Sequence, residues 1–422
     1  MRKEEVQTSR FRTVTSSLRE RNYRLYFIGQ LSSIAGSWLQ NVALAFLVLR
    51  LTHSGAELGL TSGALFLPIF VFGPLGGVVA DRVDKRKFLF VTQSLLAVWA
   101  GAFGLLTATG VIRMWMVFVL ALCTGVTNAF DLPPRQSLLA ETVPRDKVQN
   151  AISLNSVSVN IARVFGAALG GIIVTLFGLA LCFGLNALSF CSVLLTLFLM
   201  RTRDLYPSPR PDGERHQVRA GLHYVRETPE LIVPLMMIVV TGTLAYEFPV
   251  SLPLLAVDTF HKGAGTYALL ACALALGAIA GGIVSASRSK FSARTLAITA
   301  IGWGLAILAA AGAPNLPTEL TALVLVGFGT IPFSTSAKST VQLASAPTMR
   351  GRVMALWAVA WQGTTVIGGP IVGWTAQEVG ARWALAIGGL PTVLIGVVAW
   401  PALQRIDRES GEAKARLSAR GN

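Results

Sequence analysis

Long apolar runs recur along this chain, and they constrain its fold more than any other feature of the sequence. A helix of about 20 apolar residues is long enough to cross the hydrocarbon core of a bilayer. We place twelve such spans, at residues 23–50, 56–80, 88–109, 113–138, 148–176, 180–200, 231–257, 264–286, 294–312, 319–341, 353–376 and 383–403. The sequence therefore predicts an all-α polytopic membrane protein with both termini on one side.

The overall composition favours the same class. Of the 422 residues, 53% are hydrophobic and 14% are charged, which is too little charge for the surface of a water-soluble protein of this size. The net charge of +15 would suit a nucleic-acid binder, but Lys and Arg here punctuate apolar runs instead of clustering beside aromatic residues. We therefore expect anionic lipids of the inner leaflet, and no nucleic acid, as the partner of this charge.

The loop charges orient the spans, because cytoplasmic loops carry an excess of Lys and Arg. One side holds most of them, in the amino-terminal tail, in the loops around 81–87, 145–147, 201–226, 288–294 and 350–352, and in the carboxyl-terminal tail. The other side has Arg50, Arg113, Lys262 and Arg382. We expect the first side to be cytoplasmic and the protein to lie in a bacterial inner membrane. Residues 1–21 are polar and basic, so no cleaved signal peptide is expected.

A polar segment at 205–230 divides the spans into six and six. Its first part is rich in Pro and charge and reads as a linker. Its second part places Val218, Leu222 and Val225 at helical spacing among arginines, which predicts a short amphipathic helix on the inner membrane surface. The predicted organisation is an amino-terminal tail at 1–22, a six-helix bundle at 23–204, the linker at 205–230, a second six-helix bundle at 231–404, and a carboxyl-terminal tail at 405–422.

The two bundles are related in sequence. An ungapped shift of 203 residues lays "FDLPPRQSLL" (130–139) on "FSTSAKSTVQ" (333–342), so that Phe130 aligns with Phe333 and Arg135 with Lys338. Parallel repeats of six helices are a transporter plan in which the substrate site lies between the halves, near the bilayer midplane.

One loop motif, at the end of the second span, combines Gly and charge. Gly73, Gly76 and Gly77 leave a smooth helix face for close packing. Asp81 follows Gly77 by four residues, hence on the same face, where its carboxylate can accept hydrogen bonds from the amino-terminal end of a neighbouring helix. The basic residues beyond it suit lipid headgroups; they are Arg82, Lys85, Arg86 and Lys87.

This motif, Gly77-x-x-x-Asp81-Arg82-x-Asp84-Lys85-Arg86, resembles the loop motif of the major facilitator superfamily. The resemblance implies that Asp81 and Arg82 latch the cytoplasmic side in the outward-facing state. Asp84 stands where the family has Gly, a tolerable change because Asp enters left-handed conformations more easily than most residues. Lys85 stands for Arg, which forfeits bidentate pairing.

The resemblance extends along most of the chain. "GQLSSIAGSWLQNVALAFLVLRLT" (29–52), "NIARVFGAALGG" (160–171) and "YEFPVSLPLLAVDTF" (246–260) resemble the branch that contains the enterobactin exporter and macrolide efflux pumps. That branch implies outward transport of drugs, siderophores or other amphipathic metabolites, of the drug:proton antiporter type. An antiporter-like motif is present as Gly166, Gly170 and Gly171 with Ala167 in place of Pro, and span eleven keeps Gly369 and Pro370.

Four ionisable residues lie at membrane depth: Asp131, Arg163, Glu247 and Lys338. Such residues are costly in lipid and are functional candidates. Asp131 and Lys338 lie towards the ends of their spans, as boundary anchors or as site residues. Arg163 and Glu247 each lie about 24 Å along their spans, either as a coupled functional pair or as a structural one. Glu247, beside the helix-weakening Pro249, is our candidate proton carrier, since loss of water favours the neutral form of a carboxyl. Asp131 is the alternative carrier.

Polar and aromatic residues in three spans are predicted to line a large, mostly apolar substrate cavity, or else to bond between helices: Ser33, Ser37, Trp38, Gln40, Asn41, Asn128 and Tyr246. The sequence has no phosphate-binding loop, no metalloprotease or serine-hydrolase motif and no cysteine pair with metal-site spacing. We therefore expect a monomeric secondary active exporter driven by the proton gradient, with no cofactor and no metal. Uptake and lipid flipping remain open, and a non-transporting membrane protein or an intramembrane enzyme is the rival from another class.

Overall fold

The computed structural model describes residues 16–206, 217–287, 293–346 and 349–420, and it leaves the side chains of a few of these, Asp81 among them, outside the description. The described chain is helical, which confirms the predicted fold class. It divides into two compact units, one formed by residues 1–53 and 67–212 and the other by residues 54–66 and 213–422. The boundary at 212 falls inside the segment that the sequence marks as a linker. The division differs from the predicted bundles in one respect. Residues 54–66, in the second predicted span, belong to the second unit and not to the first.

The first unit is built from helices α2 (Arg21–Thr52), α4 (Lys85–Ala108), α5 (Met114–Glu141), α6 (Val148–Phe177) and α7 (Leu179–Leu199), with the second half of α3 (Gly55–Arg82). Short 3-10 turns flank them at Ser16–Arg19, Arg145–Lys147 and Thr202–Asp204. Tyr23 and Tyr26 of α2 pack with residues of α4, α5 and α7 in a buried cluster near one end of this unit.

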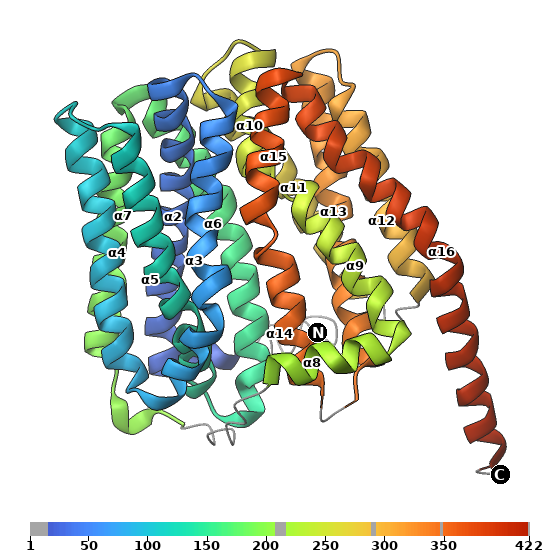
Figure 1. Cartoon of the computed structure of the whole chain (residues 1–422). Coiled ribbons are helices and arrows are strands. Elements are labelled where there is room, and N and C mark those ends of the chain that lie inside the picture. Colours follow the sequence, from blue (N-terminus) through green and yellow to red (C-terminus); the bar gives the residue numbers. More distant parts are fainter. Residues whose placement is uncertain (1–15, 207–216, 288–292, 347–348, 421–422) are drawn as a thin grey trace, which may run out of the picture. The chain divides into compact units, whose positions relative to one another are not determined.

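The second unit contains the first half of α3 and the remaining helices (Figure 1): α8 (Gln217–Glu227), α9 (Pro229–Leu244), α10 (Phe248–Leu254), a π-turn at Leu255–Thr259, α11 (Ala264–Ser287), α12 (Ala293–Ala311), α13 (Leu316–Ala344), α14 (Arg350–Gln362), α15 (Thr365–Glu378) and α16 (Ala381–Arg420). The first half of α3 packs against α15, where a Cβ on Gly369 would lie 2.9 Å from the carbonyl oxygen of Gly59.

Helix pairing repeats from one unit to the other. In the first unit α2 packs on α6 and α7, and α4 packs on α5 and α7. In the second unit α9 packs on α14, α15 and α16, and α12 packs on α13 and α16. The pairing of the first unit therefore recurs in the second, as expected for two copies of one six-helix plan.

Eleven helices of the described chain are long and apolar enough to span a membrane. The predicted span at 353–376 is not among them, because it is broken at Gly363 and Thr364 into α14 and α15, each too short alone. The span at 231–257 is also interrupted: α9 ends at Leu244 and α10 begins at Phe248. In the described chain, the twelve predicted spans thus correspond to ten continuous long helices and two interrupted ones, α9–α10 and α14–α15.

Two peripheral segments differ from their predicted form. Helix α16 runs on to Arg420 instead of ending near residue 403, so the predicted tail continues the last span as helix (Figure 1). Helix α8 forms as predicted, but Val225 on its apolar face is buried against Leu231, Val341 and Val353 of its own unit, while Leu222 is 43% exposed. The apolar face of α8 is therefore used at least partly for packing within the protein.

Candidate functional site

The break between α9 and α10 places Glu247 in an irregular segment at membrane depth. Glu247 is the residue before α10, with φ −80° and ψ 33°, and Pro249 occupies the first turn of that helix. A proline has no backbone N–H to donate, so it fits the first turn of a new helix but interrupts a continuous one. The local sequence thus dictates a new helix start beside this carboxylate.

The side chain of Glu247 is only 2% exposed. Neither carboxylate oxygen makes a hydrogen bond of normal geometry with the described residues, although the Thr365 side chain lies close by. A buried carboxylate normally has such partners, and lacking them is costly for its charged form. This arrangement fits a functional group better than a structural one.

Both broken helices meet at Glu247. Gly368 of α15 lies directly against α9, because a Cβ at this position would overlap the carbonyl oxygen of Thr243 and come 3.0 Å from Glu247 Oε1. From the other side, a Cβ on Gly242 would lie 2.8 Å from the hydroxyl oxygen of Thr364, at the break of the α14–α15 span. Glycines therefore allow the two irregular segments to approach closely around the carboxylate.

A row of aromatic rings has Tyr246, the residue before Glu247, at its middle, and we call it the aromatic row: Phe333, Trp303, Tyr246, Trp361 and Trp357. Tyr246 lies 4.7 Å from Trp303 and 4.3 Å from Trp361, measured between ring centroids. Trp361 stacks on Trp357 at 5.3 Å, and Trp303 stacks on Phe333 at 5.2 Å. Contacts of this geometry stabilise the row beyond simple burial.

The far end of the aromatic row carries a cation. The ammonium of Lys338, on α13, lies 5.7 Å from the centroid of the Trp357 ring. Lys338 is exposed, and Trp357, Trp361 and Tyr246 are half-buried, whereas Trp303 and Phe333 are buried. One end of the row thus meets an exposed lysine, and its middle ring, Tyr246, precedes the buried Glu247 in the same unit.

In the first unit, Asp131 is fully buried but well partnered. Its Oδ1 accepts hydrogen bonds from the Thr92 hydroxyl at 2.6 Å and from Gln93 Nε2 at 2.8 Å. Its Oδ2 lies 3.2 Å from Nε of Arg135, and Arg135 in turn donates to Gln30. These contacts fix the carboxylate in place between α4 and α5. Asp131 is therefore held inside the bundle, and it is not a boundary anchor facing lipid.

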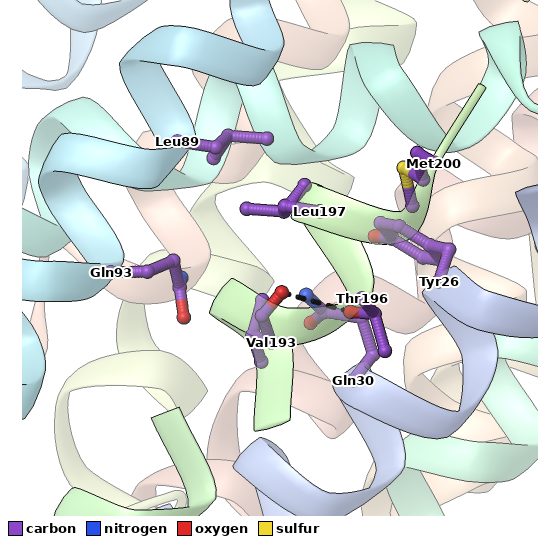
Figure 2. Close-up of a pocket in the computed structure, with 8 residues that line it drawn as sticks. All are labelled: Tyr26, Gln30, Leu89, Gln93, Val193, Thr196, Leu197 and Met200. Carbon is purple, nitrogen blue, oxygen red and sulfur yellow. Dashed lines mark hydrogen bonds between the residues drawn. The ribbon is translucent and has the colours of Figure 1, made fainter. Parts of the chain in front are cut away.

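A small pocket adjoins this cluster (Figure 2). It is lined by residues of α2, α4 and α7 and of the segment after α7, namely Tyr26, Gln30, Leu89, Gln93, Val193, Thr196, Leu197 and Met200. It has space for about one water molecule. Gln93 connects the pocket to Asp131, and its Oε1 is buried without a hydrogen-bond partner among the described residues. The pocket fits a bound water, not an amphipathic substrate.

The remaining predicted ionisable residue, Arg163 of α6, contacts span one. Its guanidinium carbon lies 5.0 Å from the Trp38 ring centroid, a cation–π contact. The two predicted residues Trp38 and Arg163 are thus brought together within the first unit.

The other predicted cavity residues differ in burial and in hydrogen bonding. Gln40 is buried and accepts a hydrogen bond from Asn186 at 2.7 Å. Ser33 is buried and its carbonyl accepts from the Ser37 hydroxyl. Asn128 is half-buried and Asn41 is exposed. Gln40 and Ser37 therefore bond within and between helices, which was the alternative reading for these positions.

The loop motif is used differently from the sequence expectation at three residues. Lys85 forms an ion pair with Glu141 of α5, and Arg86 donates to the carbonyl oxygens of Leu197 and Phe198 at the end of α7. Both therefore bind protein groups and do not simply face lipid headgroups. Asp84 is in extended conformation, with φ −66°, and caps α4 by accepting from the Lys87 N–H. It needs no left-handed conformation, so capping explains why Asp is accepted there.

The rest of the loop motif has fewer contacts in the described part of the structure. Arg82 is exposed, and the side chain of Asp81 lies outside the description. A Cβ on Gly73 or Gly77 would meet no described atom within 4 Å, whereas one on Gly76 would overlap the carbonyl oxygen of Ala129 in α5. Close packing on α5 is thus made by Gly76.

The antiporter-like glycines do pack closely. A Cβ on Gly166 would overlap the carbonyl oxygen of Ala35, and one on Gly170 would lie 2.9 Å from Val42, so α6 lies tightly on α2. Gly171 is also buried. Gly369 and Pro370 of α15 lie against Gly59 of α3 in the second unit.

Several residues of the site were not singled out from sequence. Trp303, Phe333, Trp357 and Trp361 complete the aromatic row, and Glu141 is the partner of Lys85. The i, i+4 spacing of Trp357 and Trp361 was the one signal that could have marked a common helix face. No group of three His, Cys, Asp or Glu side chains gathers as metal ligands would among the residues described.

Comparison with known proteins extends these observations. The sequence profile of a family described as transmembrane secretion effector matches residues 12–419. The multidrug efflux pump Tap of Mycolicibacterium fortuitum is 25% identical over 399 residues, which cover 92% of this chain and 97% of Tap. The enterobactin exporter EntS of Salmonella choleraesuis is 26% identical over 395 residues, covering 89% of this chain and 91% of EntS. Among solved structures, a point mutant of the nucleoside transporter NupG superposes with a TM-score of 0.73 at 15% identity, covering 91% of this chain and 99% of NupG.

Proposed function

Because the chain belongs to the transmembrane secretion effector family of the major facilitator superfamily, we propose that it is a proton-coupled exporter of amphipathic small molecules. The family consists of transporters and not of enzymes, and the chain is a multi-pass membrane protein of the major facilitator fold. Its resemblance to that superfamily is thereby confirmed. Export is supported by the names of two relatives, a multidrug efflux pump and an enterobactin exporter.

The proposal includes the setting of the protein. Both termini lie in the cytoplasm of a bacterial cell, since most loop Lys and Arg residues lie on the side that carries the termini. Anionic lipids of the inner leaflet contact those basic loops, and the transporter acts as a monomer. Substrate access alternates between the two sides of the membrane, with the latch at Asp81 and Arg82 closing the cytoplasmic side.

The single observation that carries proton coupling is the isolation of Glu247. It is buried in a helix break without a hydrogen bond of normal geometry among described residues, and its surroundings include the half-buried Tyr246. In the proposed cycle, the neutral carboxyl of Glu247 allows the transporter to open to one side of the membrane. Opening of the break to water lets the proton leave, and the charge then disfavours return without a new proton. Transport of substrate in one direction is thereby tied to proton movement in the other.

Asp131 is the weaker candidate for this role. Thr92, Gln93 and Arg135 hold its carboxylate in a fixed network, which suits a structural part of the bundle. Glu247 has no comparable set of partners in the part of the chain that the structure describes.

The test uses purified protein in liposomes with an imposed proton gradient, a fluorescent amphipathic dye as substrate and a trapped pH indicator. We expect Glu247→Gln to bind the dye but to lose dependence of its flux on the gradient. Glu319→Gln is the matched control, because Glu319 is an equally buried acid in the first turn of α13. If Glu247→Gln still moves dye uphill with unchanged proton flux, the carrier lies elsewhere and Asp131 is the next residue to test.

A further inference from the structure

We infer that the substrate class is an anion with a flat aromatic or apolar body, bound by Lys338 and the aromatic row of the second half. The inference rests on the proposed transport function and specifies its substrate. It starts from an imbalance among the charges at membrane depth. The acids there are enclosed, with Asp131 and Glu247 at most 2% exposed, whereas Lys338 is exposed.

The internal repeat explains why the charge of Lys338 is uncompensated. Lys338 aligns with Arg135 of the first half, whose guanidinium is neutralised by Asp131 one helical turn earlier. The residue aligned with Asp131 is Ser334, and its hydroxyl donates to the carbonyl oxygen of Ile331. The second half has therefore kept the cation and lost its carboxylate. Lys338 makes no ion pair or hydrogen bond with any residue that the structure describes.

The position of Lys338 favours a ligand over a lipid headgroup as its counter-ion. It lies six residues before the end of α13, about 9 Å along the axis. A lysine that serves as a membrane anchor extends its ammonium outward along the helix toward the interface. The ammonium of Lys338 instead lies over the Trp357 ring, on the side of α13 that faces α14. An exposed charge in this position requires a water-filled surface and not hydrocarbon.

The aromatic row would bind the apolar body of the substrate. Trp357, Trp361 and Tyr246 are half-buried, and their rings follow one another from the ammonium at Trp357 inward to Tyr246. Indole and phenol rings stack on flat apolar molecules in several offset arrangements, so they tolerate different substrates. A lipophilic cation would suit these rings too, but the exposed ammonium of Lys338 repels it. Glu247, the acid that could attract a cation, is enclosed. An anionic head on Lys338 with an aromatic body on the row satisfies both features.

The experiment uses three probes that share one ring system: pyrene-1-sulfonate, 1-pyrenemethanol and 1-pyrenemethylamine. Binding to the full-length protein in nanodiscs of neutral lipid is measured by energy transfer from tryptophan to pyrene, with empty nanodiscs as reference. The wild type is expected to bind the sulfonate most tightly and the amine least tightly. Lys338→Gln should weaken sulfonate binding by roughly 10- to 100-fold, the loss of one charge-assisted contact. Binding of the neutral alcohol should change less than about threefold.

Two further variants separate charge from folding. Lys338→Arg should restore sulfonate binding. Ser334→Asp rebuilds the acid of the first half one turn before Lys338 and should weaken sulfonate binding as Lys338→Gln does, while Ser334→Asn should not. The inference is overturned if the wild type prefers the amine, or if neither Lys338→Gln nor Ser334→Asp changes sulfonate binding. The inference is also overturned if Lys338→Gln leaves sulfonate binding unchanged in neutral lipid but reduces binding of anionic lipid by the protein. Lys338 would then bind a lipid headgroup.

These outcomes are distinct from those that test proton coupling. Binding is measured without a gradient, and Glu247→Gln is expected to keep the preference for the sulfonate. Transport of the sulfonate without any proton dependence would overturn the proposed coupling and leave the substrate class intact. Proton-coupled transport of the amine, without transport of the sulfonate, would overturn the substrate class and leave the proposed coupling intact.

Discussion

Gly368 offers a quantitative test of the junction between the two broken helices. In Gly368→Ala the new methyl group overlaps the backbone carbonyl of Thr243, which cannot rotate away, and comes 3.0 Å from Glu247 Oε1. Overpacking of this kind costs up to about 3 kcal/mol. The higher helix propensity of Ala offsets about 1 kcal/mol of this. The net loss is about 2 kcal/mol, or roughly 4–8 °C in the unfolding midpoint of a unit of this size.

Two matched glycines calibrate that estimate. A Cβ on Gly242 would lie 2.8 Å from the Thr364 hydroxyl oxygen and 3.0 Å from the carbonyl oxygen of Ala360, without the overlap met at Gly368, so Gly242→Ala should cost less than Gly368→Ala. A Cβ on Gly351 would meet no described atom within 4 Å, so Gly351→Ala should cause no loss. The midpoints are measured on purified protein in detergent, and dye flux is measured in liposomes. Equal midpoints for Gly368→Ala and Gly351→Ala would refute the close junction. Normal flux in a destabilised Gly368→Ala would show that the junction does not shape the environment of Glu247.

Three other changes test separate parts of the molecule. Asp131→Ala should lower stability by about 3 kcal/mol, because it leaves the half-buried Arg135 without its counter-ion. Asp131→Asn should cost less, and equal unfolding midpoints for both variants would deny the ion pair a structural role. Asp81→Asn should leave dye affinity within a few-fold while sharply reducing flux, and a matching loss of affinity would contradict the latch. Protease cleavage within the linker, at 207–214, should leave the two halves associated in detergent, as judged by size-exclusion chromatography, and their separation would show that the linker itself holds them.

Helix number and class could be predicted because each depends on local composition. A run of apolar residues long enough to cross a bilayer specifies a spanning helix without reference to any neighbour. The break at Glu247 was partly visible, since Pro249 interrupts a helix wherever it stands. The break at Gly363 and Thr364 was not, because neither residue forbids a helix, and the interruption arises where α9 packs against this span.

Site residues were predicted only where a single residue is informative by itself. Glu247 and Lys338 stood out because charge is rare in an apolar span. The aromatic row did not, since Tyr246, Trp303 and Trp361 come from three segments that are distant in sequence. Periodicity shows which residues share one face of a helix, but not which faces of different helices meet. The roles of Lys85 and Arg86 were missed for the same reason, because their partners lie on α5 and α7.

The positions of the two breaks argue for function independently of the charge on Glu247. Each break removes backbone hydrogen bonds from a helix at membrane depth, where no lipid group can replace them. Such irregular backbone is tolerated where protein or a water-filled surface covers it, and transporters use it at their binding sites. Here both breaks fall in one unit, and they contact each other through Gly242 and Gly368. The aromatic row passes the first break at Tyr246, whose ring contacts Trp361 at the end of α14, just before the second break. The irregular backbone, the enclosed acid and the ring surface thus converge on one region, which is where a conformational change in either helix would alter both proton access and substrate contact.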